Sequence, residues 1–261
     1  MTDWKTHIEY GSRALEEGNH EVAGGHFYSA WKLNPQDPLV NFIYGMELYR
    51  CGNHDEALKR LQFAMDNDDE LTGAASQWVR IKLSMSPQDP EALEKLRQLE
   101  SQHPDNLLLK MIRLELYIVM GDLENSLRIA GELEDKNVPE AGIAKAKIHQ
   151  MRGLRASAEN RLDEARQWFE EASSLDENWA GPLINQGVIA ERQGHPEKAL
   201  TYYEKALLVE PDHPVALFDL ARLSWRLGNS EKGAVYLERL EQLHPDYPGI
   251  GELRKNIEDF N

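Results

Sequence analysis

The chain has 261 residues, a formal net charge of −16 and a single cysteine. One cysteine excludes a disulfide framework, and acidic charge spread through the chain opposes contact with nucleic acid and anionic lipid. Met1-Thr2-Asp3-Trp4 shows no start of a secretory signal peptide, and no apolar run approaches the ~20 residues of a membrane span. We therefore expect a cytoplasmic protein without membrane insertion.

A small residue recurs along the whole chain at a nearly constant interval. The positions are Ala23, Ala57, Ala92, Ser126, Ala165, Ala199 and Gly233. The successive spacings are 34, 35, 34, 39, 34 and 34 residues. A fixed period of this length indicates one supersecondary unit copied seven times, which stacks into a solenoid instead of closing around one core.

Each unit reads as two helices joined by a tight turn. Gly52 followed by Asn53 is typical: glycine ends one helix and the next polar residue caps the following helix. Apolar residues four and seven positions after the small residue, such as Leu61 and Ala64, give one face of an amphipathic helix. Proline residues then end the unit, as Pro35 does.

The period divides the chain into domains. We predict repeats 1–4 in residues 4–140, an irregular junction at 141–145, repeats 5–7 in residues 146–247 and a capping helix in residues 248–261. The third repeat replaces the Gly-Asn turn with Ser86-Pro87-Gln88-Asp89-Pro90, which is one residue longer. Because Asp89 can cap a helix and Pro90 can open it, this is a harmless loop variant.

The junction at 141–145 is the larger irregularity. It leads into a repeat that places Arg152 and Arg155 where a first helix packs against its neighbours. Burial of two unpaired guanidinium groups would cost several kcal/mol. We expect instead a longer, rotated helix that begins near Pro139, so that the junction divides the solenoid. The alternative is a locally lengthened helix without a mechanical role.

After the seventh repeat the apolar residues Ile250, Leu253, Ile257 and Phe260 recur at intervals of 3, 4 and 3. This stripe predicts a final helix with one apolar face, which closes the last repeat.

The repeat resembles the tetratricopeptide repeat. Tyr10-Gly11, Tyr44-Gly45 and Gln186-Gly187 fall on the family's Leu-Gly positions, and Ala199, Tyr203, Ala206 and Pro211 match its second-helix signature. The resemblance covers nearly the whole chain. It implies an all-α, right-handed α-solenoid whose first helices line a concave face, and it does not imply one function.

The sequence shows no motif that carries chemistry. The nine histidines form no metal-ligand spacing, and Cys51 at a helix end is expected to be an inert thiol. There is no catalytic triad and no nucleotide motif. We therefore predict a protein that is not an enzyme and needs no metal or cofactor.

Some tetratricopeptide domains bind the acidic C-termini of Hsp70 and Hsp90 through a two-carboxylate clamp. The clamp positions of the first three repeats here are Ile8, Ser12, Ile43, Gly73 and Gln77. From the fifth repeat onward they are Gln150, Leu154, Asn185, Val215 and Asp219. Neither frame matches the clamp's pattern of basic and amide residues, so Hsp70 or Hsp90 binding by a carboxylate clamp is not expected.

The concave positions of the first helices are mostly apolar, and such walls accept an apolar or amphipathic segment of a partner. The predicted partner-binding residues are Leu39, Phe42, Met46, Tyr49, Met111, Ile118, Ile184, Val188, Phe218, Arg222 and Trp225. Phe218, Arg222 and Trp225 share one helix face and form the predicted anchor. The alternative is that these residues simply pack against each other.

Three classes of function fit these features. The first, which we favour, is a non-catalytic adaptor or assembly chaperone that binds an apolar or amphipathic segment of a partner protein. The second is a structural subunit of a stable homo- or hetero-oligomer. The third is an accessory regulator of a separate enzyme. We expect no nucleic acid binding. The basic cluster that could contradict this is Lys145, Lys147, Arg152, Arg155, Arg161 and Arg166.

Overall fold

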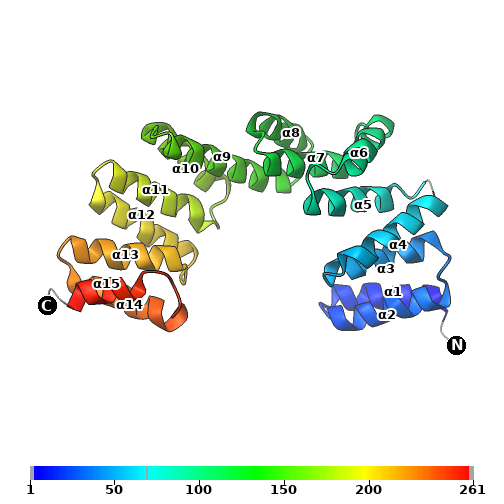
Figure 1. The fold of residues 1–261 in the computed structure, drawn as a ribbon, viewed down its shortest axis with the longest axis horizontal. Helices are drawn as coiled ribbons and strands as arrows, with labels where there is room; N and C mark the ends of the chain where they lie inside the picture. The colour runs from blue at the N-terminus through cyan, green and yellow to red at the C-terminus, as the bar shows by residue number, and fades with distance from the viewer. Residues whose placement is uncertain (1–2, 69, 259–261) are drawn as a thin grey trace. The chain divides into compact units, whose positions relative to one another are not determined.

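The computed structural model describes residues 3–68 and 70–258, without the side chains of 256–258. The regular structure of these residues consists of fifteen helices (Figure 1). They fall into two compact units, residues 1–122 and 123–261. The first unit holds α1 (Trp4–Glu16), α2 (His20–Leu33), α3 (Pro38–Arg50), α4 (His54–Asn67), α5 (Thr72–Met85), α6 (Pro90–Gln102) and α7 (Leu107–Met120). The second unit holds α8 (Leu123–Asp135), α9 (Glu140–Ala158), α10 (Leu162–Leu175), α11 (Ala180–Arg192), α12 (Pro196–Val209), α13 (Pro214–Arg226), α14 (Ser230–Leu243) and α15 (Ile250–Glu258).

Successive helices pack as pairs, as the repeat predicts. In the first unit α1 packs on α2 and α3 on α4, and in the second α9 packs on α10, α11 on α12 and α13 on α14. Gly52 has a positive φ of 79° and closes α3, and the Asn53 side chain accepts a hydrogen bond from the Glu56 backbone N–H to cap α4. His195 makes no such cap, and α12 opens with Pro196 instead. The all-α solenoid of helix pairs is confirmed.

A glycine on the first helix receives an aromatic ring from the second helix in three repeats. A Cβ atom added to Gly11, Gly153 or Gly187 would lie 2.5, 2.5 or 2.4 Å from a ring atom. The rings belong to Phe27, Phe169 and Tyr203, each sixteen positions after its glycine. Because real Cβ atoms do not approach this closely, only glycine allows these helices to pack at this distance.

The third repeat keeps the helix pair despite its longer turn. The Asp89 side chain accepts a hydrogen bond from the Ala92 backbone N–H at 2.9 Å, and Pro90 stands in the first turn of α6. The interpretation of Ser86–Pro90 as a harmless loop variant agrees with this geometry.

The five extra residues at 141–145 are part of a long helix. Helix α9 has 19 residues and begins directly after Pro139, as expected. The Arg152 guanidinium lies 4.9 Å from the centre of the Trp168 ring, and exposed Arg155 pairs with Glu159. Neither guanidinium is therefore buried without a partner. The predicted junction at 141–145 is thus a segment of a continuous helix in which Ala141 and Ala146 are buried, and its role in dividing the solenoid stays a prediction. The boundary between the two compact units follows Asp122.

Helix α15 covers the end of the last repeat. Ile250 and Leu253 are buried in one cluster with Leu217, Leu237 and Leu240. The predicted stripe continues to Ile257, whose side chain is outside the described part, and to Phe260, which lies outside the described residues. The described half of the stripe thus packs as the pattern predicts.

Deletion of residues 249–261 is expected to lower the melting temperature and the solubility of the protein. The deletion uncovers Leu217, Leu237 and Leu240, which are at most 4% exposed with α15 in place, and an end repeat has no other neighbour to bury this face. Circular dichroism melting and light scattering measure the effect. An unchanged melting curve without aggregation would contradict it.

Within the described residues, no helix is both long enough and apolar enough to cross a membrane.

Candidate protein-binding surfaces

The predicted partner-binding residues of the first unit lie on α3 and α7, both first helices of a repeat. Leu39 is 44% exposed. Phe42, Met46 and Tyr49 are half-buried and pack against the cluster that contains Trp78. Met111 and Ile118 on α7 are half-buried as well. Most of these side chains therefore contribute to packing and leave only part of their surface accessible.

The predicted residues of the second unit divide in the same way. Val188 is 37% exposed, whereas Ile184 is buried in the cluster formed by α11, α12 and α13. Phe218 packs its ring 5.4 Å from that of Tyr247, and half-buried Trp225 packs against the cluster of Leu237. Ile184 therefore packs in the core, with only 6% of its surface exposed. Phe218 and Trp225 have a packing role in addition to their accessible area.

An apolar cavity of about 250 Å³ lies between α5 and α7 in the first unit. We call it the α5–α7 cavity. Leu83, Ile112, Leu116 and Val119 line it together with Ser84, Arg80 and Glu115. Arg80 donates to Glu115 at 2.6 Å, so the charges at the cavity are paired. The cavity is consequently an apolar hollow with a neutral rim.

Three apolar side chains at this cavity, or next in sequence to residues that line it, are strongly exposed. Val119 is 67% exposed, and Met120 and Met85 are each 53% exposed. Met85 and Met120 are the last residues of α5 and α7 and follow the lining residues Ser84 and Val119. The exposed apolar surface here is at these helix ends. The predicted residues Met111 and Ile118 each stand one position before a residue that lines the cavity.

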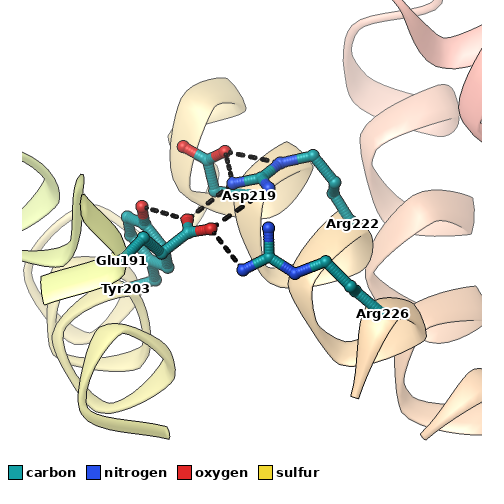
Figure 2. Close-up of polar contacts among 5 residues, drawn as sticks. All are labelled: Glu191, Tyr203, Asp219, Arg222 and Arg226. Carbon is teal, nitrogen blue, oxygen red and sulfur yellow. Dashed lines mark hydrogen bonds and ion pairs between the residues drawn. The ribbon is translucent and has the colours of Figure 1, made fainter. Parts of the chain in front are cut away.

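A polar network connects α11, α12 and α13 in the second unit, and Figure 2 shows its five residues. Arg222 donates to Glu191 at 2.6 Å and to Asp219 at 2.9 Å. Arg226 donates to Glu191 at 2.8 Å, and the Tyr203 hydroxyl donates to Glu191 at 2.9 Å. Glu191 thus joins three donors from two neighbouring helices. The predicted anchor residue Arg222 is already paired within the chain.

Burial and pairing act differently on the two carboxylates of this network. Burial disfavours the charged form of Glu191, but the hydrogen bonds and positive charge of Arg222 outweigh it and hold its pKa below the usual value. Burial dominates at Asp219 and raises its pKa, although Arg222 acts in the opposite direction. On acidification the protein loses stability through Glu191 and gains it through Asp219, so the two contributions oppose each other.

Within the described part of the chain, the cysteine and the potential metal ligands do not assemble into a site. Partial burial and the nearby Glu47 carboxylate raise the pKa of the Cys51 thiol, which disfavours the reactive thiolate. No group of three or more potential metal-ligand side chains occurs among the residues that the structure describes.

The basic residues of α9 and α10 do not form a free stripe. Lys145 pairs with Glu134, Arg155 with Glu159, Arg166 with Glu170, and Arg161 with both Glu159 and Glu164. Arg152 covers the Trp168 ring. The cluster that could have contacted a nucleic acid backbone is therefore largely compensated by acidic neighbours.

Comparison with known proteins agrees with this architecture. A sequence model of the tetratricopeptide repeat family matches residues 184–248. No curated protein matches the chain significantly. A tetratricopeptide repeat protein from Parabacteroides merdae is similar in structure, with 17% identity, 98% of each chain covered and a TM-score of 0.58. The C-terminal part of a repeat-containing protein from Cytophaga hutchinsonii has 14% identity and a TM-score of 0.57, with 94% of this chain and 98% of that chain covered.

The chain therefore has the fold of the tetratricopeptide repeat proteins, and residues 184–248 match the sequence model of that family. This class of fold commonly serves as a scaffold for protein–protein interaction.

Proposed function

We propose that this protein is a non-catalytic scaffold, an adaptor or assembly chaperone, that binds an apolar or amphipathic segment of a partner protein. The α5–α7 cavity is the observation that carries the proposal. It offers an apolar hollow of about 250 Å³ beside the exposed side chains of Val119, Met120 and Met85. Flexible methionines adapt to varied apolar partners, and an apolar helix face or an aliphatic anchor fits such a hollow.

Two other functions remain as alternatives. The chain could be a structural subunit whose apolar surface is covered in a stable oligomer, or a regulator of a separate enzyme. The molecular mass of the protein in solution distinguishes the adaptor from the structural subunit. A monomer supports the adaptor, and a stable oligomer supports the subunit. We propose a cytoplasmic location, because a single cysteine is compatible with a reducing compartment. We propose no binding to nucleic acid or to Hsp70 and Hsp90 tails, because the net charge is −16 and the basic cluster of α9 and α10 is mostly paired.

A photo-crosslinking residue at position 119 is expected to capture a partner protein that the same residue at position 235 does not capture. Val119 and Val235 form a matched pair, since both are valines and are 67% and 60% exposed. Val235 lies on α14, a second helix that contributes nothing to the α5–α7 cavity. Mass spectrometry of the crosslinked product identifies the partner.

The purified partner is then titrated against point variants. Val119→Asp is expected to weaken its binding at least 10-fold, because a carboxylate would have to be desolvated against the apolar partner, while Val235→Asp changes it less than 2-fold. Equal effects of the two substitutions, or none, would contradict the proposed surface. Circular dichroism checks that both variants stay helical.

A further inference from the structure

A groove runs along α6 in the first unit, away from the α5–α7 cavity. Its larger part is a cavity of about 560 Å³ lined by α4, α5 and α6. A second cavity of about 270 Å³ shares Met65, Lys95 and Gln98 with the first. Because the two cavities have these walls in common, they form one elongated depression, which we call the α4–α6 groove. Its size lies in the range of ligand sites, and its length suits a chain segment better than a compact molecule.

The floor of the α4–α6 groove is apolar and rigid. Trp78 and Leu99 are 4% and 5% exposed, so each shows only a small area to the groove. Met65 from α4 is half-buried and lines both cavities. An aliphatic side chain laid on Met65 and the exposed part of Trp78 would therefore lose water contact, next to Lys82, whose Nζ lies 5.1 Å from the centre of the Trp78 ring.

The rim of the larger cavity is acidic. The carboxylates of Asp66, Glu91 and Glu94 lie on it. The described residues that line this cavity include one basic side chain, that of Lys95. The charged partners of these carboxylates are weak: Lys82 is 3.6 Å from Glu91, and the Glu94–Arg97 pair is 73% and 64% exposed. Asp66 accepts a hydrogen bond from the neutral Gln62 amide at 2.8 Å. Exposed ion pairs of this kind contribute little to stability. These carboxylates can therefore exchange their partners for incoming cations, and the chain's charge of −16 adds a long-range attraction.

One wall presents polar groups at a regular spacing. Glu94, Gln98 and Gln102 follow each other at four-residue intervals on α6, and all three are exposed. Four residues of an α-helix rise about 6 Å. An extended chain repeats every two residues, or about 6.7 Å. A glutamine amide donates and accepts hydrogen bonds, so Gln98 and Gln102 can each reach a backbone amide on the same edge of an extended segment.

We propose that the α4–α6 groove binds an extended basic segment of a partner protein. Lysine or arginine side chains of the segment pair with Asp66, Glu91 and Glu94, its aliphatic side chains lie over Met65 and Trp78, and its backbone bonds to Gln98 and Gln102. This surface is formed largely by second helices, whereas the α5–α7 cavity lies between first helices. The proposal does not depend on the function proposed for that cavity.

A fluorescein-labelled hexapeptide of alternating lysine and leucine is the probe. In fluorescence anisotropy at low salt it is expected to bind more tightly than the glutamate–leucine counterpart. It is also expected to bind more tightly than a peptide with three lysines followed by three leucines, because only alternation separates the two side-chain types onto opposite sides of an extended chain. Failure of the protein to bind the alternating peptide, or equal affinity for all three peptides, would overturn the proposal.

Two sets of variants locate the binding. The triple variant Asp66→Asn, Glu91→Gln, Glu94→Gln is expected to weaken binding at least 10-fold. The control Glu177→Gln, Glu231→Gln, Glu238→Gln removes the same charge from exposed positions of the second unit and is expected to change binding less than 2-fold. Equal weakening by both would show general charge attraction and would overturn the site.

The amide wall is tested separately. The double variant Gln98→Ala, Gln102→Ala changes no charge and is expected to weaken binding about 5-fold, which a purely electrostatic contact would not do. An unchanged affinity would contradict the extended binding mode. Val119→Asp should leave the affinity for this peptide unaltered, so the outcome is independent of the α5–α7 cavity.

Discussion

Gly187→Ala is expected to lower the free energy of unfolding by about 2–3 kcal/mol. The added Cβ atom would lie 2.4 Å from the Tyr203 ring, and Tyr203 is fully buried with its hydroxyl held by Glu191. The ring therefore has no free direction of movement, and α11 and α12 must separate. Overpacking of this kind costs about 1–3 kcal/mol and occasionally more. The shift of the urea midpoint, followed by circular dichroism, measures the loss.

A control and a rescue variant distinguish overpacking from a general intolerance of alanine. Gly25 lies inside α2, and an added Cβ atom would meet no atom within 4 Å. Gly25→Ala is therefore expected to raise stability by up to about 1 kcal/mol through helix propensity. The double variant Gly187→Ala, Tyr203→Leu copies the natural pair Ala221 and Leu237 of the seventh repeat, which share one buried cluster. It should recover part of the lost stability, and failure to do so would contradict the proposed steric cause.

Glu191→Ala is expected to lower the free energy of unfolding by about 2–3 kcal/mol. The substitution leaves the Tyr203 hydroxyl and Arg226 without the partner they have in Figure 2, and Arg222 keeps only Asp219. Hydrogen bonds to charged groups contribute about 1.5–3 kcal/mol, and a buried donor left unpaired costs its desolvation. The Glu191 side chain is only 12% exposed, so water replaces the lost contacts poorly.

Glu204→Ala is the matched control for this prediction. Glu204 also connects the sixth repeat to the seventh, through an ion pair with Lys232. Both side chains are about two-fifths exposed, at 40% and 41%, so the expected loss is below about 1 kcal/mol. A Glu191 variant no less stable than the Glu204 variant would show that the buried network does not secure this junction.

The repeat architecture could be predicted from the sequence because it depends on local rules. The glycine turns and the apolar stripe are each visible within about ten residues, most repeats carry both, and the small residues mark the period of 34 to 39 residues. The 19-residue helix α9 was predicted for a physical reason as well, since the cost of burying Arg152 and Arg155 required a shifted helix.

The candidate binding surfaces were harder to predict. A helical period does not fix which of two adjacent positions lines a cavity, so Ile112, Leu116 and Val119, which line the α5–α7 cavity, were not among the predicted residues. Arg222 was assigned to a partner because Glu191 lies 31 positions away in the preceding repeat. A sequence shows such a partner only when residues of adjacent repeats are compared. The predicted binding residues all lie on first helices, whereas the α4–α6 groove is lined mostly by second helices.

The glycine–ring pairs determine which segments of this protein can be exchanged. The residue on a first helix and the residue sixteen positions later fill one space between the two helices, so a smaller residue at one position accompanies a larger residue at the other. The pair is glycine and tyrosine in the sixth repeat, and alanine and leucine in the seventh. A recombinant that joins α13 to a copy of α12 would bring a tyrosine ring against Ala221, whereas a transplanted α11–α12 hairpin carries its matching partner with it. The hairpin, not the single helix, is therefore the smallest piece that modular engineering of this solenoid can shuffle, duplicate or graft.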